Sequence, residues 1–300
     1  MRLRTAAALA TVYVVWGSTY LGIAIAIRSW PPLTMCGVRY LLAGGLLYVW
    51  ARARGAAPPT AAQWRAALWV GLGLLLLGNG GVAWAEEYVH SGVVALVVAV
   101  VPLWLALLDR KPLSLAAALG LALGFGGVAV LVGPGAGFQW QAIVVAFTSL
   151  GWAAGSIYAR SAPTPDSPVL GIGMQMLAGG VLLSAAGGVR GEFPHVSVPS
   201  AASLGALAYL VVVGSIVTFS VYIWLLRNAR TSLVGTYAFV NPVVAVLLGA
   251  LFNGEPLHVR TLVAGAVIVL GVALIVVGPT WRYPRRRENV QPALGQASVR

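Results

Sequence analysis

The feature that most constrains this chain is a succession of apolar segments, which together fill almost the whole sequence. A transmembrane helix needs about 20 predominantly apolar residues to cross the hydrocarbon core of a bilayer. We therefore predict an all-α polytopic membrane protein with ten transmembrane helices. The predicted helices span residues 6–27, 33–51, 65–85, 91–108, 114–133, 139–159, 168–189, 202–226, 232–252 and 260–279.

The composition agrees with a membrane protein and excludes several other classes. Only 9% of the residues are charged, against about 25% in soluble domains. The net charge of +12 does not indicate nucleic-acid binding, because the basic residues form no face with interleaved aromatic residues. The single cysteine, Cys36, closes no intramolecular disulfide. The first apolar run continues to Ile27 without a cleavage site, so we expect a retained helix rather than a signal peptide.

The basic residues divide unequally between the two sides of the predicted bundle. If the segments cross the membrane alternately, one side carries only Arg28, Arg190 and Arg260, while Arg39 lies inside a segment. Because cytoplasmic connectors are rich in Lys and Arg, we place both termini in the cytoplasm. The cytoplasmic side then carries Arg2, Arg4, Arg52, Arg54, Arg65, Arg110, Lys111, Arg160, Arg227, Arg230, Arg282, Arg285, Arg286, Arg287 and Arg300.

The sequence also repeats itself. LLAGGLL at 41–47 returns as MLAGGVLL at 176–183, and KPLS at 111–114 returns as EPLH at 255–258. We predict two repeats of five helices each, residues 1–135 and 136–280, followed by a basic cytoplasmic tail, residues 281–300. Since five is an odd number, the second repeat enters the membrane upside down. Inverted repeats of this kind are typical of secondary transporters.

Two prolines occupy matching places in the two repeats. Pro102 lies within VVPLW and Pro242 within FVNPVVA. Each removes a backbone N–H and frees the carbonyl of the residue four positions earlier, Val98 or Ala238. Such carbonyls are tolerated in a membrane where they line a wet cavity or meet a neighbouring helix. We therefore predict hinges at Pro102 and Pro242 beside a central site, with a packing kink as the alternative.

Two charged residues need a physical explanation. Arg39 costs about 2.5–3.5 kcal/mol inside a membrane, so we expect it to face a cavity as the counter-charge of Glu86 or of a substrate carboxylate. The alternative is that Arg39 reaches the lipid headgroups. Glu86 follows the Gly-rich residues 78–81, which we expect to form a hinge or a broken helix. An inward-facing Glu86 would have a raised pKa and could carry a proton; the alternative is a solvated loop acid.

Aromatic and amide residues deep in the segments are further candidates for solute contacts. They lie too deep for an interfacial aromatic belt, and the alternative is helix packing with interhelical hydrogen bonds. One Arg and one Glu among aromatic residues would suit a zwitterion such as an amino acid, but also many drugs. The predicted substrate-binding residues are Trp16, Tyr20, Arg39, Asn79, Trp84, Glu86, Trp152, Tyr222, Tyr237 and Asn241.

Several motifs together carry a resemblance to a known family: VWGSTYLGI at 15–23, LLGNGG at 76–81, GSIYARS at 155–161 and YAFVNPVVAVLLG at 237–249. Over about residues 8–280 the chain resembles the EamA branch of the drug/metabolite transporter superfamily. The resemblance implies ten helices in two inverted five-helix repeats, with a cavity built by the first four helices of each repeat. It also implies export of amino acids, metabolites or drugs without nucleotide hydrolysis. One departure is Lys111, where the second repeat has Glu255.

We therefore predict a secondary active exporter of small amphipathic solutes in the bacterial inner membrane, working by alternating access. A membrane channel or facilitative pore is the alternative. We expect no enzyme activity, catalytic residue, cofactor or metal site, because GPGAG at 133–137 lacks the lysine of a phosphate loop and the histidines are dispersed. The expected partners are a small-molecule substrate, the lipid bilayer and protons as a candidate coupling ion, but not nucleic acid. The protein is expected to be a monomer, or a homodimer through the fifth and tenth helices, where Gly120 and Gly124 have GxxxG spacing.

Overall fold

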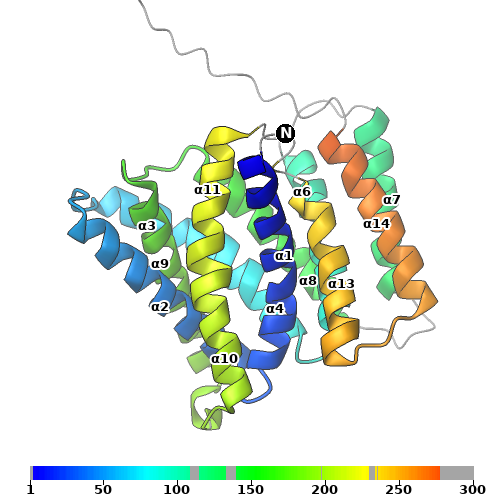
Figure 1. Cartoon of the computed structure of the whole chain (residues 1–300), viewed down its shortest axis with the longest axis horizontal. Helices are drawn as coiled ribbons and strands as arrows, with labels where there is room; N and C mark the ends of the chain where they lie inside the picture. The colour runs from blue at the N-terminus through cyan, green and yellow to red at the C-terminus, as the bar shows by residue number, and fades with distance from the viewer. Residues whose placement is uncertain are drawn as a thin grey trace, which may run out of the picture.

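The computed structural model describes residues 3–108, 115–132, 140–196, 198–229, 234 and 236–277, and every regular element in these ranges is helical (Figure 1). The predicted basic tail, residues 281–300, lies outside them. The helices of the first half are α1 (Leu3–Ala26), α2 (Pro32–Ala53), α3 (Ala61–Gly71), η1 (Leu72–Gly80), α4 (Gly81–Ala85), α5 (Ser91–Val98), α6 (Val101–Leu108) and α7 (Leu115–Val132). Those of the second half are α8 (Trp140–Ala159), α9 (Pro168–Val189), η2 (Phe193–His195), α10 (Ala201–Tyr209), η3 (Leu210–Val217), α11 (Thr218–Asn228), α13 (Tyr237–Asn253) and α14 (Val259–Val277).

Each apolar segment predicted from the sequence contains a helix. Within the described ranges, seven helical stretches are long and apolar enough to cross a membrane, and three shorter apolar helices accompany them. The seven are Leu3–Ala26, Pro32–Ala53, Ala61–Ala85, Ser91–Leu108, Trp140–Ala159, Pro168–Val189 and Ala201–Tyr222. The shorter ones are Leu115–Leu131, Tyr237–Asn253 and Val259–Ile275. The membrane fold is thus shown, whereas the number of spans stays a prediction.

In the part of the chain that the structure describes, two stretches are wound as π-helices within longer helical rods. η1 lies between α3 and α4, and η3 lies between α10 and α11. The wider turn is accompanied by side-chain donors on backbone carbonyls: Asn79 Nδ2 donates to the carbonyl of Leu74 at 3.1 Å, and Ser215 Oγ donates to that of Leu210 at 2.9 Å. The Gly-rich residues expected to break the third helix therefore lie in a continuous rod with π winding.

The two prolines differ in what they do to their helices. α5 ends at Val98 and α6 begins at Val101, so Pro102 is the second residue of a new helix. A proline is tolerated there because the first helical turn needs no intrahelical N–H donor. Pro242 instead lies inside α13, which continues through it. Only the first proline interrupts its helix.

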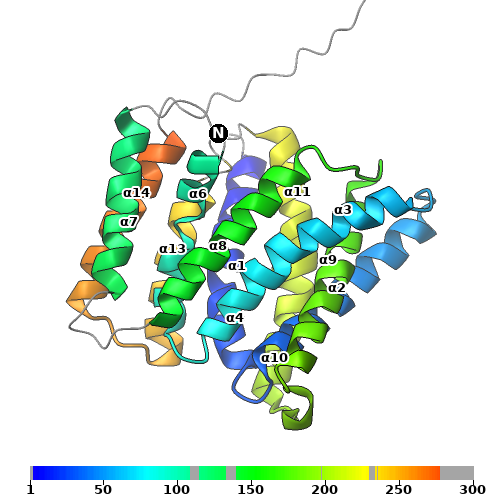
Figure 2. The same ribbon diagram turned by 180° about the vertical axis from the view of Figure 1, so that it is seen from behind.

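Close helix packing depends on glycine at several contacts. α2 packs along α9, where a Cβ on Gly44 would lie 2.7 Å from the backbone nitrogen of Leu177. α7 packs along α14, where a Cβ on Gly120 would lie 2.6 Å from the carbonyl of Gly271. Figures 1 and 2 show α7 and α14 side by side at one edge of the bundle. The glycine face considered for a dimer is therefore covered by α14 of the same chain.

The outer surface of the bundle is strongly apolar. Large side chains that a soluble protein would bury are exposed on most rods. In a bilayer such side chains face lipid tails, which are as apolar as the side chains themselves. Examples are Val14, Leu46, Val49, Trp69, Phe147, Leu251 and Leu270.

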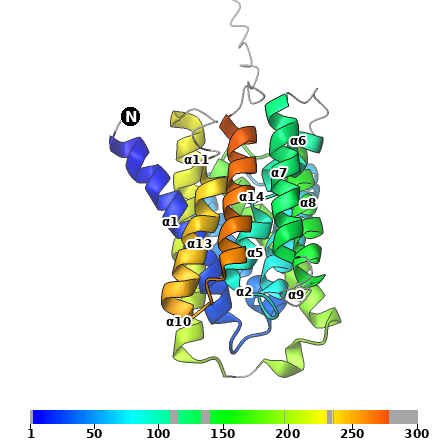
Figure 3. The ribbon, with the colours of Figure 1, turned by 90° about the vertical axis from the view of Figure 1, so that its right-hand side faces the viewer.

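The bundle has two ends that differ in their polar contacts. Figure 3 shows α1 beginning at one end, here named the near end, while the α9–α10 and α13–α14 connections lie at the opposite, far end. At the far end, carboxylates of the second half accept hydrogen bonds from the first. Glu192 accepts from the backbone N–H and hydroxyl of Thr34 at 2.7 and 2.9 Å. Glu255 accepts from the hydroxyl of Ser91 at 2.6 Å and the N–H of Gly92 at 3.0 Å.

Further far-end contacts join the same two halves, apart from the Arg190–Glu192 ion pair, which lies within the second half. Arg190 forms ion pairs with Glu87 at 2.6 Å and with Glu192 at 2.9 Å, and Arg28 donates to Asn253. We name these contacts, together with those of Glu192 and Glu255, the far-end latch. Nearer the middle of α1, the hydroxyl groups of Tyr13 and Thr236 share a hydrogen bond that also joins the two halves.

Candidate solute-binding cavity

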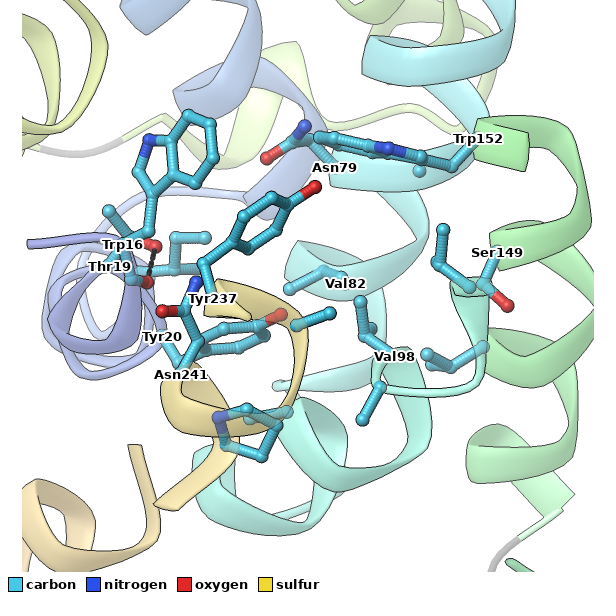
Figure 4. A pocket seen from close by; sticks show the side chains of 18 of the residues that line it. Trp16, Thr19, Tyr20, Asn79, Val82, Val98, Ser149, Trp152, Tyr237 and Asn241 are labelled. Atoms are coloured by element: carbon cyan, nitrogen blue, oxygen red, sulfur yellow. Dashed lines mark hydrogen bonds between the residues drawn. The ribbon is translucent and has the colours of Figure 1, made fainter. Parts of the chain in front are cut away.

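A cavity of about 170 Å³ lies between the two halves of the chain. Figure 4 shows side chains from α1, η1, α8 and α13 pointing into it. Among the described residues, α7, α9 and α14 contribute nothing to its lining. The first half contributes Trp16, Thr19, Tyr20, Ile23, Arg39, Tyr40, Gly78, Asn79, Val82, Ala95, Val98, Ala99, Val101, Pro102 and Leu105. The second half contributes Val145, Ser149, Trp152, Phe219, Tyr237, Ala238, Asn241 and Pro242.

One wall of the cavity is a cluster of aromatic rings around Trp16. Its ring centre lies 5.0 Å from that of Tyr222, 5.1 Å from that of Tyr237 and 5.4 Å from that of Phe219. These separations are typical of favourable aromatic pairs. Tyr222 is not itself a lining residue, and instead supports Trp16 and Tyr237 from behind. The cluster therefore holds two predicted contact residues in fixed positions.

Trp152 takes its place in the wall because η1 carries a glycine opposite it. A Cβ on Gly78 would lie 2.4 Å from Cε3 of Trp152, closer than any packed side chain can come. Any larger residue at this position would have to displace the indole ring. The glycine thus explains how α8 can bring a large aromatic ring against η1.

Arg39 is buried, with 3% of its surface exposed, and it lines the cavity. Its Nε donates to Ser215 Oγ at 3.1 Å, and its guanidinium carbon lies 4.7 Å from the ring centre of Tyr40. The alternative that Arg39 reaches the lipid headgroups is therefore wrong. Within the described part of the chain Arg39 forms no ion pair with Glu86. The structure therefore does not show Arg39 as the counter-charge of Glu86.

The predicted amides also line the cavity, although each already has a structural partner. Asn79 donates to the carbonyl within η1 described above. In the orientation that satisfies its hydrogen bonds, Asn241 donates to the carbonyls of Tyr13 and Tyr237 at 3.2 Å each. Thr19 bonds back to the carbonyl of Trp16 at 2.6 Å, as the dashed line in Figure 4 shows. Tyr20 lines the cavity as well.

Both prolines expected beside the site lie in the cavity wall. The carbonyls that they free belong to Val98 and Ala238, and these residues line the cavity as well. The sequence therefore placed the prolines next to the cavity correctly. Movement about Pro102 and Pro242 stays a prediction.

Glu86 is outside the cavity wall and lies one helical turn beyond Val82, toward the far end. Both of its carboxylate oxygens are buried without a hydrogen-bond partner in the described residues. Burial, reinforced by the negative charge of Glu255, raises the pKa of Glu86 well above its ordinary value of 4.5. The alternative of a solvated loop acid is therefore wrong.

Trp84 also lies away from the cavity. Its ring centre is 5.5 Å from those of Tyr88 and Trp140, both of which are exposed. The structure therefore brings together seven of the predicted binding residues and separates three. Those in the wall are Trp16, Tyr20, Arg39, Asn79, Trp152, Tyr237 and Asn241, and those outside it are Trp84, Glu86 and Tyr222. Solute binding by any of them stays a prediction.

Sequence reasoning missed several polar lining residues. Ser149 lies three residues before Trp152, on the same helix face, so helical spacing could have identified it. Its hydroxyl accepts from Trp104 Nε1 at 3.0 Å. Tyr40, next to Arg39, carries no comparable signal, and neither does Ser215, which binds Arg39 without lining the cavity. The positions of both depend on how α2 meets η3.

Comparison with known proteins agrees with this architecture. The model of the EamA-like transporter family matches residues 4–133 and again residues 139–277. The chain is 42% identical to the uncharacterized inner membrane transporter YedA of Escherichia coli K12, over 97% of this chain and 96% of that protein. It is 26% identical to the uncharacterized transporter YvbV of Bacillus subtilis, over 91% of each.

A solved crystal structure supports the fold. It superposes with a TM-score of 0.61 over 92% of this chain and 98% of that chain, at 18% identity. At this identity the likeness concerns the fold alone. The family model, however, covers both halves almost completely, and the Escherichia coli relative matches along nearly its full length. This chain therefore belongs to the EamA-like transporter family.

Proposed function

We propose that the protein is a secondary active exporter, which carries small amphipathic solutes across the bacterial inner membrane by alternating access. The cavity carries this proposal, because aromatic and polar side chains from both halves line it inside an apolar bundle. Secondary transporters bind their solutes at such an interface between repeats. The inner-membrane location is supported by the name of the Escherichia coli relative.

In this proposal the chain forms ten transmembrane helices in two inverted repeats, residues 1–135 and 136–280. The family model matches once within each half, which supports the repeat. The two π-helices support it too, because η1 and η3 lie in the third helical rod of their halves and each brings a polar residue inward. A cytoplasmic near end is favoured by the exposed Arg52, Arg54 and Arg65 in and near the α2–α3 connection.

The far-end latch fits the closed gate of an alternating-access cycle. The hydrogen bonds of Glu192 and Glu255 and the Arg190–Glu87 ion pair join the two halves beyond the cavity, so they must break before a solute can leave on that side. The break between α5 and α6 at Pro102 gives the first half a point about which to bend. Pro242, inside α13, is the corresponding point of the second half.

Glu86 is the residue that we assign to proton coupling. A carboxylic acid with buried, unpartnered oxygens holds a proton readily and releases it when the site opens to water. Glu86 lies between the cavity wall and the far end, one helical turn beyond Val82, so in this proposal opening of the far-end latch admits water to it. Proton release and solute release would then depend on the same movement.

Transport by purified protein in liposomes tests the proposed function. A growth-toxicity screen of an overexpressing strain first identifies a solute. We expect saturable counterflow of that solute, faster with an imposed pH gradient, and about tenfold slower in Trp152→Ala, which removes a cavity wall. Trp69→Ala is the matched control, because Trp69 is exposed on the lipid-facing surface and should keep the wild-type rate.

The channel alternative makes a different prediction for the same liposomes. A channel conducts without saturation and shows single-channel currents, whereas a carrier shows counterflow and no such currents. Single-channel conductance, or equal effects of the two tryptophan substitutions, would contradict the exporter proposal.

A further inference from the structure

Arg39 is the one charged side chain among the described residues that line the cavity. The others are aromatic, aliphatic, hydroxyl or amide groups, and no carboxylate stands among them. The acids near this part of the molecule, Glu86, Glu192 and Glu255, lie beyond the wall toward the far end. The cavity is therefore a positively charged space with an apolar lining.

The hydrogen bonds of Arg39 are incomplete. Nε is occupied by Ser215, and the face of the guanidinium rests on Tyr40. Nη1 is buried and has no hydrogen-bond partner in the described residues. A buried cation without a counter-charge is costly, and its natural partner is a carboxylate that accepts a charge-assisted hydrogen bond from Nη1. Among the residues that the structure describes, none supplies such a carboxylate.

The cavity has room for one aromatic ring. At about 170 Å³ it is close to the cavity of about 150 Å³ that holds one benzene molecule in another protein. Trp16, Trp152 and Tyr237 offer ring faces and edges to such a body. A single ring with a short polar arm is therefore the shape that the walls favour.

An ammonium group has no carboxylate partner in this wall. From the sequence we predicted that Glu86 and Arg39 both face the cavity and together suit a zwitterion. The structure instead puts Glu86 outside the cavity wall. A second positive charge would also be repelled by Arg39 across a space of low dielectric constant. The amino group of a zwitterion thus adds no attraction, and a cation is disfavoured.

From this geometry we infer, resting on the proposed function, that the cavity selects small organic monoanions. Arg39 binds the carboxylate, and the aromatic walls hold one ring. The solute needs no ammonium group. The inference narrows the amphipathic solutes of the proposed function to one charge class.

Calorimetric titration of the purified full-length protein tests this selectivity with four probes that share one ring: phenylacetate, phenylacetamide, phenethylamine and phenylalanine. We expect phenylacetate to bind at least about tenfold tighter than phenylacetamide, the gain of one charge-assisted contact, and phenethylamine to bind most weakly. Phenylalanine should bind no tighter than phenylacetate. Equal affinities for acid and amide, or a preference for the amine, would overturn the inference.

Two substitutions locate the selectivity. Arg39→Gln should lower phenylacetate affinity to that of phenylacetamide and leave the amide affinity unchanged, whereas Arg65→Gln, on an exposed part of α3, should change neither. If Arg39→Gln does not fold, Arg39→Met serves instead, because an apolar side chain of similar length removes the charge without leaving a buried polar group unpaired, and it should abolish the preference for phenylacetate. Unchanged preference in the folded variant would overturn the role of Arg39.

Liposome flux separates this inference from the proposed function. Preferential binding of phenylacetate without transport of any solute would support the anion site and contradict the proposed export. Transport of solutes at rates that do not depend on their charge would support the proposed export and contradict the anion site.

Discussion

Close contacts between helices in this molecule depend on glycine at single positions. Trp152 reaches the cavity because η1 carries Gly78, and α2 meets α9 because it carries Gly44. At Gly45, by contrast, a Cβ would meet nothing within 4 Å. The same glycine-to-alanine change therefore has opposite consequences at positions that look alike in the sequence.

Gly78→Ala is expected to damage the cavity. The new Cβ would overlap Trp152 and force either the indole or α8 to move, at a cost of about 1–3 kcal/mol in folding free energy. Thermal unfolding in detergent should show a lower midpoint, and binding of the transported solute should weaken. Gly45→Ala is the matched control and should keep or slightly raise stability. Equal midpoints for Gly78→Ala and wild type would contradict the packing described here.

The burial of the Glu86 carboxyl group predicts that the stability of the folded protein depends on pH. Because burial raises the pKa of Glu86 above 4.5, the folded protein favours the protonated form. The free energy of unfolding is therefore highest below pH 4.5, where Glu86 is protonated in both the folded and the unfolded state. It decreases as the pH rises toward the raised pKa, because only the unfolded state then loses the proton. Unfolding midpoints measured across this range should fall in wild type and fall less in Glu86→Gln.

The control for Glu86 is Asp166→Asn, which removes an exposed acid from the α8–α9 connection. This variant should keep the wild-type pH dependence. If Glu86→Gln loses stability with rising pH as steeply as wild type, then Glu86 does not hold the proton.

At the scale of whole elements, helix positions follow from the sequence but their winding does not. The predicted ranges 33–51, 91–108 and 168–189 match Pro32–Ala53, Ser91–Leu108 and Pro168–Val189 closely, because prolines and polar connectors bound each apolar run. The π winding of η1 and η3 depends on side-chain donors and on neighbouring helices. Neither the side-chain donors nor the neighbouring helices can be predicted from a pattern of apolar residues.

This difference explains which candidate residues were placed correctly. Trp16, Tyr20 and Arg39 come from regular helices, where depth and spacing predict an inward position. Trp84 follows η1, and each π turn adds a residue that rotates the next helix face relative to an α-helical pattern. Inward positions after such a turn cannot be derived from α-helical spacing.

The far-end latch leads to a prediction about Glu255. Burial raises the pKa of Glu255, but hydrogen bonds from Ser91, Gly92 and Asn253 outweigh it and hold the pKa below its ordinary value. Glu255→Gln removes the charge from these bonds, so the far end should open more often, by about tenfold. The measurement is maleimide labelling, from the far side, of Val98→Cys in a Cys36→Ala background.

Asp166→Asn is again a suitable control, because it is outside the far-end latch and should leave the labelling rate of Val98→Cys unchanged. An unchanged rate in Glu255→Gln would mean that this carboxylate does not hold the far end closed.

At the scale of the whole molecule, the proposed inverted repeat fixes which connections share a side of the membrane. Both ends of the chain and the α2–α3 connection would face the cytoplasm, while the α9–α10 connection would face outward. Exposed arginines gather at the first of these sides, as the asymmetry of cytoplasmic connectors requires. The topology therefore rests on charge as well as on helix count.

Cysteine labelling in intact cells tests this topology. In a Cys36→Ala background, His195→Cys should react with an impermeant maleimide from outside, because it is exposed in the α9–α10 connection. Ala57→Cys, exposed in the α2–α3 connection, should react only after the membrane is permeabilised. Labelling of both from outside would break the alternation on which two antiparallel repeats depend. The reversed pattern would preserve the repeats but place the far-end latch, and with it Glu86, on the cytoplasmic side.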